Sequence, residues 1–313
     1  MTIKKMAEKL LCQLEGQGYK GRIVSIQHLR DLQEEIEGRH RQGLFCEEFY
    51  QERLTWFTFK PPDSFPEARS LIVVAVPDPQ TQVTFTWEGR RVTLIVPPTY
   101  LHWQKVNKKA EDLLAETLNP QGYRVVPAGL PVKLLAVHSG LGAYGKNNVT
   151  YVPGMGSFHR LAAFYSDFPC QEDSWQEARM MDACQKCRAC LHRCPTDAIT
   201  SDRFLLHAER CITFHNEKPK DIPFPEWINP SWHNCLVGCL HCQRVCPENR
   251  DFLEWVVGGE EFFQEETALL LEGVPLEQLP ATTVKKLERL DLIEYLDFLP
   301  RNLSVMLEKR DGH

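Results

Sequence analysis

The feature that most constrains this chain is a pair of short cysteine runs. The first, at residues 184–195, reads C-x2-C-x2-C-x3-C-P, and the second, at residues 239–247, reads C-x2-C-x3-C-P. Three thiols spaced three residues apart in a tight loop can point at three corners of one iron–sulfur cube. The fourth thiol, followed by proline, leaves the loop and reaches a second cube. The spacing therefore predicts two [4Fe–4S] clusters in one small region.

Two cubes take eight thiolates, and the two runs supply all but one of them. Cys211 and Cys235 are the candidates for the last position, and Cys211 is preferred because Cys235-x3-Cys239 does not match the usual spacing. Zinc is the alternative metal, but its ligands usually come as two separated pairs. The predicted ligands are Cys184, Cys187, Cys190 and Cys246 for one cube, and Cys194, Cys211, Cys239 and Cys242 for the other.

The composition is that of an ordinary globular protein. The 313 residues are 43% hydrophobic and carry a net charge of −6, which argues against a protein that coats nucleic acid. The longest aliphatic run, at residues 71–76, is far too short to span a bilayer, and the charged N-terminus lacks a signal-peptide core. Disulfides are rare in a reducing compartment, so twelve cysteines indicate metal or redox chemistry. We therefore expect a cytoplasmic protein without a membrane partner.

The hydrophobic pattern predicts a mixture of helices and strands in the first half of the chain, an α/β or α+β fold. From residue 171 to about 250 the strand signals fade, and residues 251–313 are acidic, with two or three short helices. The expected elements are a helical region at 1–55, a buried strand at 71–76, a strand–turn–strand at 83–96, a helix at 103–118, and short strands at 124–126, 148–152 and 161–165.

A glycine-rich loop at residues 138–148 contains G-x-G-x-x-G. As a nucleotide fingerprint it is weak, because no clear strand precedes it and no helix follows it. A loop whose backbone approaches a large planar cofactor is the other interpretation. Residues 86–160 hold an excess of basic side chains, which form either a solvated face or a groove for an anionic group. The candidate cofactor-binding residues are Gly140, Gly142, Gly145, Lys146, Asn147 and Ser157.

The order of these motifs resembles that of the epoxyqueuosine reductases. The shared blocks are the loop at 140–147, Gly156-Ser157-Phe158, the CxxCxxCxxxCPTxAI run, Cys211, and the second cysteine run up to Asn249. The resemblance implies cobalamin beside two [4Fe–4S] clusters and the same crossed ligation of the cubes. It implies a nitroreductase-like corrinoid and substrate domain at 1–170, a ferredoxin-like double-cluster domain at 171–250 and a short acidic helical segment at 251–313.

The chain departs from the family pattern in two ways that affect function. The family has an acidic residue before the glycine loop, thought to donate a proton to the epoxide, but residues 125–129 read VVPAG. Tyr100, His102 and Tyr144 are the candidate catalytic proton donors in its place. The acidic segment at 251–313 replaces a helical-repeat domain that helps to bind tRNA, and it would repel phosphate. We therefore do not expect tRNA as a partner.

Three hypotheses follow for the function. The first is an oxidoreductase that passes electrons through two clusters to a cobalamin, which reduces a small molecule. The second is an electron-transfer protein that activates a corrinoid or metal centre on a redox partner protein. The third is an atypical tRNA epoxyqueuosine reductase that uses tyrosine or histidine as its acid.

Overall fold

The computed structural model describes residues 2–308, and the contacts within it divide the chain into two interleaved units. Unit 1 comprises Met1–Asp78, Trp103–Arg188 and Ser201–Leu206, and unit 2 comprises Pro79–His102, Ala189–Thr200 and His207–His313. This division differs from the three consecutive segments predicted above, because strands at residues 80–96 pair with a strand at 256–262. Among the described residues, none of the helices combines the length and apolarity needed to cross a membrane.

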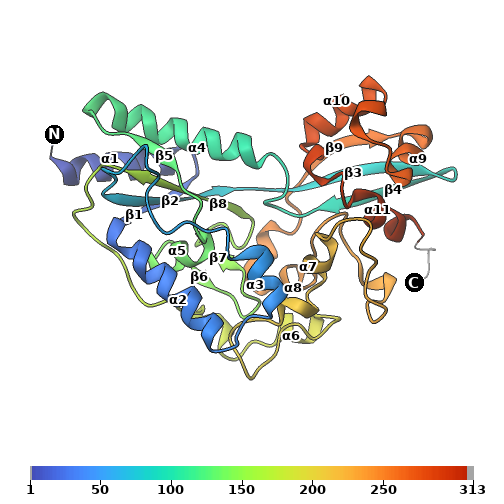
Figure 1. Cartoon of the computed structure of the whole chain (residues 1–313), viewed down its shortest axis with the longest axis horizontal. Coiled ribbons are helices and arrows are strands. Elements are labelled where there is room, and N and C mark those ends of the chain that lie inside the picture. The colour runs from blue at the N-terminus through green and yellow to red at the C-terminus, as the bar shows by residue number, and fades with distance from the viewer. Residues whose placement is uncertain (1, 309–313) are drawn as a thin grey trace. The chain divides into compact units, whose positions relative to one another are not determined.

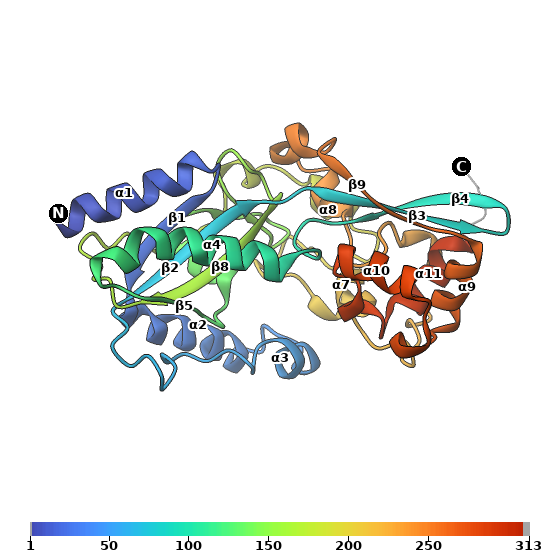
Figure 2. The same cartoon turned by 90° about the horizontal axis from the view of Figure 1, so that it is seen from above.

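Unit 1 is built on a four-stranded antiparallel sheet with helices on both faces (Figures 1 and 2). The strand order is β1-β2-β8-β5, and a two-stranded hairpin, β6-β7, lies apart from this sheet. The elements of unit 1 are α1 (Ile3–Gly16), β1 (Lys20–Ser25), α2 (Leu29–Arg41), α3 (Glu47–Arg53), β2 (Ser70–Pro77), α4 (Trp103–Leu118), β5 (Val125–Pro127), α5 (Val132–His138), β6 (Ala143–Tyr144), β7 (Thr150–Tyr151) and β8 (His159–Ser166).

Strand β2 shows why this sheet forms. Its side chains alternate between the faces, so Ile72 packs with α1 and α4, whereas Leu71 and Val73 pack with α2 and α5. Both faces are covered, and the strand therefore reads as a continuous apolar run, as predicted. The expectation of helix throughout residues 1–55 is wrong at Lys20–Ser25, because this segment pairs with β2 and cross-strand pairing outweighs its helix-like spacing.

Unit 2 contains a three-stranded sheet of order β4-β3-β9 and six of the eight predicted ligand cysteines. Strands β3 (Gln80–Trp87) and β4 (Arg90–Val96) form the predicted hairpin, with Glu88 and Gly89 at positive φ in its turn. Strand β9 (Val256–Phe262) runs parallel to β3 and was missed from the sequence. The helices are α6 (Ala189–Arg193), α7 (Ile212–Asn216), α8 (His241–Arg244), α9 (Gln264–Glu272), α10 (Ala281–Leu290) and α11 (Leu299–Leu307).

The core of unit 2 joins its sheet to the three C-terminal helices. Phe85 of β3 and Phe262 of β9 stack with ring centroids 5.2 Å apart, and Leu287 and Leu303 are fully buried against them. The two or three short helices predicted for residues 251–313 are α9, α10 and α11. This core supports the loops that carry the cysteines.

Candidate metal centre

Four of the predicted ligand cysteines lie in unit 2 and come from three separate segments. Cys194 follows α6, Cys211 precedes α7, and Cys239 and Cys242 flank the start of α8. Helices α6 and α8 pack on each other, so the segment of Cys194 lies beside the segment of Cys239 and Cys242 within the unit. The fold therefore supplies what sequence spacing alone could not, a single frame for thiols up to 48 residues apart in the chain.

These half-buried thiols interact with one another. Burial raises the pKa of the Cys239 thiol well above its usual value, and the neighbouring Cys242 and Cys211 raise it further, with Cys235 contributing least. Burial likewise raises the pKa of Cys211, opposed by hydrogen bonds from Thr213 and reinforced by Cys194. Clustered thiols of this kind stay protonated unless a metal compensates their charge, which is the chemistry of a thiolate-bound cluster.

A buried side-chain amide nearby fits the same interpretation. Asn234 accepts a hydrogen bond from the Leu240 backbone at 3.3 Å, so it bridges the loop that carries Cys235 and Cys239. Its Nδ2 is buried without a hydrogen-bond partner among the described residues. Hydrogen bonds to cluster sulfurs tune iron–sulfur centres, and a bound cube would give this donor an acceptor.

The other four predicted ligands are distributed between the units. Cys184 and Cys187 lie in unit 1, and Cys190 and Cys246 lie in unit 2. Within residues 2–308 no three His, Cys, Asp or Glu side chains are arranged to hold a single metal ion. The thiolates of a cube bind four different irons, so they need not approach as closely as the ligands of one ion.

The glycine-rich loop of unit 1 is shaped by its own packing. A Cβ at Gly142 would lie 2.5 Å from the Tyr151 carbonyl oxygen, and a Cβ at Gly145 would lie 2.5 Å from the Tyr151 ring. Only glycine lets the backbone approach β7 this closely. The side chain of Asn147 is buried in the same hairpin, where it donates to the Tyr151 hydroxyl at 3.1 Å. The glycine spacing is thus explained without a ligand.

Lys146, expected to face an anionic group, instead contacts a cysteine segment. Its ammonium donates to the Cys187 carbonyl oxygen at 2.7 Å, within unit 1. Gly140 has a φ of +73° and ends the turn after α5, and Ser157 is buried at 4% exposure. Lys146 therefore anchors the loop between two predicted cluster ligands, a role that the sequence did not indicate.

The three candidate proton donors lie in different surroundings. Tyr100 of unit 2 is partly buried and donates to Glu217 at 2.7 Å. Burial first, and then the Glu217 carboxylate, raises its pKa well above the usual value. Burial also raises the pKa of Tyr144 in unit 1. His102 of unit 2 is half-exposed, and its Nδ1 lies 3.2 Å from the Asp291 carboxylate.

A stack of rings holds the segment that leads to the first cysteine run. The Trp175 indole lies between His28 and His138, with ring centroids 4.1 Å and 4.7 Å away. His138 donates from Nδ1 to the Gln176 carbonyl oxygen and from Nε2 to Glu35, both at 2.6 Å. No sequence pattern indicated this arrangement, because its members are up to 148 residues apart.

The Glu35–His138 pair makes the stability of unit 1 depend on pH. Burial lowers the pKa of His138, but the hydrogen bonds to Glu35 and Gln176 and the Glu35 charge together raise it above 6.5. Burial raises the pKa of Glu35, but His138 and Arg39 together bring it below 4.5. The stabilisation that protonated His138 contributes is complete below pH 6.5, and it is lost as the pH rises through the raised pKa of His138. The stabilisation that ionised Glu35 contributes is complete above pH 4.5, and it is lost as the pH falls through the lowered pKa of Glu35.

We therefore expect Glu35→Gln to destabilise the protein more at pH 6 than at pH 8.5. The measurement is the free energy of unfolding in urea at both pH values. The matched control is Glu34→Gln, because Glu34 pairs with Arg30 on the exposed face of the same helix. Equal losses at the two pH values would contradict the pairing described here.

The class of the protein follows from the cysteine segments and from a comparison of the chain with models of known protein families. Residues 183–249 match the family model of the 4Fe-4S double cluster binding domain. The prediction of a mixed α/β protein with a double-cluster domain is confirmed.

The predicted resemblance to epoxyqueuosine reductases is also confirmed. The chain is 28% identical over 229 residues to the epoxyqueuosine reductase of Staphylococcus aureus, covering 70% of this chain and 58% of that protein. It is 34% identical over 149 residues to that of Pseudomonas aeruginosa, covering 47% of this chain and 40% of that protein. The chain thus aligns with about half the length of these relatives.

A solved structure of an epoxyqueuosine reductase with a tRNA-Tyr epoxyqueuosine-modified stem loop shares the fold. Its TM-score is 0.66 at 21% identity, over 98% of this chain and 82% of that one. Our expectation that tRNA is not a partner is contradicted by this complex and by the names of the curated relatives. That expectation relied on the acidic charge of residues 251–313, and the charge of one segment does not decide where a separate surface binds phosphate.

Proposed function

We propose that this chain is an iron–sulfur reductase that acts on an epoxide carried by a tRNA stem loop. The observation that carries the proposal is the set of interacting thiols Cys194, Cys211, Cys239 and Cys242 in unit 2, within a region that matches a double-cluster domain. Bound cubes supply single electrons at low potential. The sequence relatives, named epoxyqueuosine reductases, supply the substrate class.

We further propose that unit 1 binds cobalamin, as the family resemblance implies. Two polar atoms of this unit support a bound polar ligand: Thr150 Oγ1 on β7 and His159 Nδ1 on β8 are buried and lack partners among the described residues. Buried groups of this kind usually meet water or a ligand. Residues 125–129 contain no carboxylate, and of the candidate proton donors Tyr144 is the one that lies in this unit.

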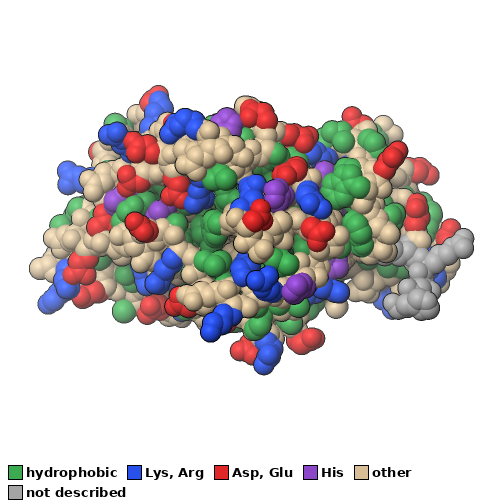
Figure 3. All heavy atoms as spheres, turned by 90° about the horizontal axis from the view of Figure 1, so that it is seen from below, with side chains coloured by type: hydrophobic (Ala, Val, Ile, Leu, Met, Phe, Trp, Pro, Cys, Tyr) green, Lys and Arg blue, Asp and Glu red, His purple; other side chains and the backbone are tan. Residues whose placement is uncertain are grey.

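The distribution of charged side chains on the surface affects how tRNA would bind. On the face drawn in Figure 3, basic side chains are interspersed with acidic ones. Phosphate binding there would rest on individual lysines and arginines rather than on a broad positive field. Because few phosphates would then be neutralised, we expect the affinity for a stem loop to fall only moderately with salt.

The test is conversion of an epoxyqueuosine-containing anticodon stem loop by anaerobically purified protein with cobalamin and a chemical reductant. Mass spectrometry should show loss of the epoxide oxygen, and the corrinoid spectrum should change on reduction. A stem loop that stays unmodified, with clusters and corrinoid both present and reducible, would exclude the substrate. A corrinoid that neither co-elutes nor changes its spectrum would exclude the cofactor.

A second candidate is an electron-transfer protein or a reductase of a small molecule. The specific observation in its favour is the VVPAG sequence at residues 125–129, where the family has an acid. Reduction of a partner corrinoid without stem-loop turnover would favour this candidate over the first.

Lys146 provides a test of the cysteine assignment in unit 1. Its ammonium lies 2.7 Å from the carbonyl oxygen of Cys187, a predicted cluster ligand. A positive charge at this distance favours the reduced cluster, so Lys146→Gln should lower the reduction potential of one cluster by roughly tens of millivolts. Potentiometric titration followed by electron paramagnetic resonance measures this shift. Lys146→Arg keeps the charge and should leave the potential near that of the wild type.

A further inference from the structure

A pocket of about 480 Å³ opens in unit 2 beside the buried cysteines. Its wall includes Pro195 and Arg210, which are the immediate chain neighbours of Cys194 and Cys211. These two cysteines interact within the unit. Whatever occupies the pocket therefore lies next to the backbone that carries two predicted ligands of one cluster.

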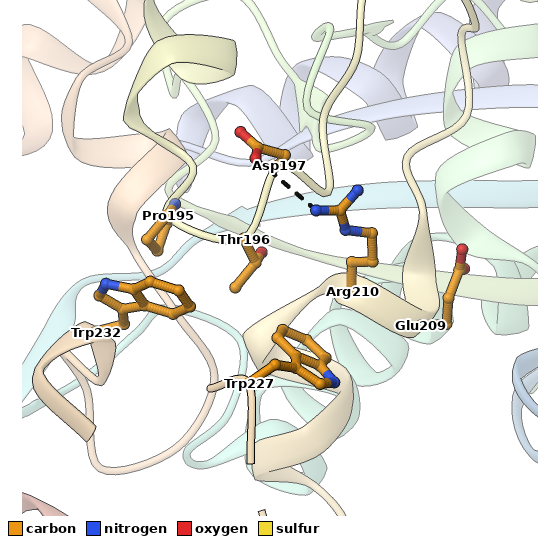
Figure 4. A pocket seen from close by; sticks show the side chains of 7 residues that line it. All are labelled: Pro195, Thr196, Asp197, Glu209, Arg210, Trp227 and Trp232. Carbon is orange, nitrogen blue, oxygen red and sulfur yellow. Dashed lines mark ion pairs between the residues drawn. The ribbon is translucent and has the colours of Figure 1, made fainter. Parts of the chain in front are cut away.

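Two indole rings form the aromatic walls of the pocket. Figure 4 shows Trp227 and Trp232 on two sides of the space, with Thr196 between them. Trp227 is 46% exposed, although tryptophan is among the side chains that gain most from burial. Exposed indole faces around a concave space are suited to a planar aromatic ligand, which stacks on them.

Both tryptophans contact the segments that carry the cysteines, Trp227 through its ring and Trp232 through its backbone carbonyl. His215 meets Trp227 edge-on, with centroids 5.3 Å apart, and its own Nε2 donates to the Glu209 carbonyl oxygen at 2.8 Å. His241, which lies between Cys239 and Cys242, donates to the Trp232 carbonyl oxygen at 2.8 Å. The pocket is thus fixed to the cluster segments, and its walls are positioned in advance of any ligand.

The polar groups of the pocket can orient a bound ligand. Arg210 pairs with Asp197 at 3.8 Å, a loose contact that leaves guanidinium donors for a ligand. The carboxylate of Glu209 points away from the rings (Figure 4). A cation beside a planar redox cofactor stabilises its reduced, more negative form.

We propose that this pocket binds the isoalloxazine ring of a reduced flavin and is the point at which electrons enter the cluster held by Cys194, Cys211, Cys239 and Cys242. The proposal rests on the proposed function for the presence of that cluster. In each transfer the reduced flavin loses one electron and one proton, the cluster gains the electron, and the proton passes to solvent. The flavin N–H bond breaks, and no covalent bond forms to the protein.

The test uses the full chain, purified without oxygen, with two flavin sources in separate arms: free reduced FMN and a reduced flavodoxin. Binding of oxidised FMN is measured by its fluorescence, and cluster reduction by stopped-flow bleaching of the iron–sulfur absorbance. Trp227→Leu and Trp232→Leu should each weaken FMN binding and slow cluster reduction by flavin about tenfold or more. Trp227→Phe should restore most of both, and Trp56→Leu, at an exposed site in unit 1, should change neither.

The outcomes separate this inference from the proposed function. Iron and sulfide content and reduction by dithionite are measured first, and their absence would refute the proposed function itself. With clusters present, slower reduction by flavodoxin in the variants identifies a flavoprotein as the source, and slower reduction by FMN alone identifies the free cofactor. Wild-type rates in both arms, or equal displacement of FMN by AMP or UMP, would overturn the inference.

Discussion

Cys211→Ala is expected to purify anaerobically with about four iron and four sulfide atoms per chain instead of about eight. In unit 2 Cys211 interacts with both Cys194 and Cys239, so it is placed among the ligands of one cube. Removing one of four thiolates leaves an iron exposed and the remaining buried thiols without a stable partner. Metal sites that lose a ligand lose much of their affinity, and here we expect the whole cube to be lost.

The matched control is Cys235→Ala. Cys235 is fully buried near Cys239 but has the smallest effect on it among the neighbouring cysteines. We expect this variant to keep about eight iron atoms. Iron and sulfide analysis of the two proteins, with electron paramagnetic resonance of the reduced samples, decides between the two cysteines. Loss of a cluster in Cys235→Ala with retention in Cys211→Ala would reverse the assignment.

Gly259→Ala should destabilise the protein by about 2 kcal/mol, because overpacking forces a backbone shift. A Cβ at this position would lie 2.6 Å from the Gln82 carbonyl oxygen and 3.0 Å from Thr81 and Leu290. The clash falls where β9 pairs with β3 and where the register shifts. Since a backbone oxygen cannot move aside as a side-chain tip can, the strand itself must shift. Thermal unfolding followed by circular dichroism measures the loss.

The preceding residue is an internal control for this prediction. Gly258 lies in the same strand, and no atom lies within 4 Å of the position of its Cβ. Gly258→Ala should therefore change the free energy of unfolding by no more than about 0.5 kcal/mol. Two variants of equal stability would show that β9 does not pair with β3 as described.

The boundaries of several elements follow from local sequence. The helix at Trp103–Leu118 has the predicted range, and the hairpin has the predicted turn although β3 begins three residues earlier, at Gln80. Side-chain periodicity and a tight turn are properties of adjacent residues. Strand β9 was missed because two consecutive glycines interrupt its strand pattern. Its partner lies more than 170 residues away, and no local signal encodes such a pairing.

Some features of the candidate site were likewise predictable from local sequence, and others were not. Cysteine spacing alone predicted the double-cluster domain, because each short run places several ligands at the spacing that cubes require. The role of the glycine loop could not be predicted from adjacent residues. Gly142 and Gly145 are required because they pack closely against Tyr151, and Lys146 donates a hydrogen bond to Cys187. The pocket between Trp227 and Trp232 likewise depends on histidines from two other segments.

The sequence by itself determined that this chain carries thiols for two cubes and a mixed sheet-and-helix fold, since both are written in short-range spacing. Only the tertiary structure decided which cysteines share a unit, what the glycines pack against and where a planar ligand can stack. Those features arise from contacts between segments far apart in the chain, and such contacts depend on the packing of the whole unit.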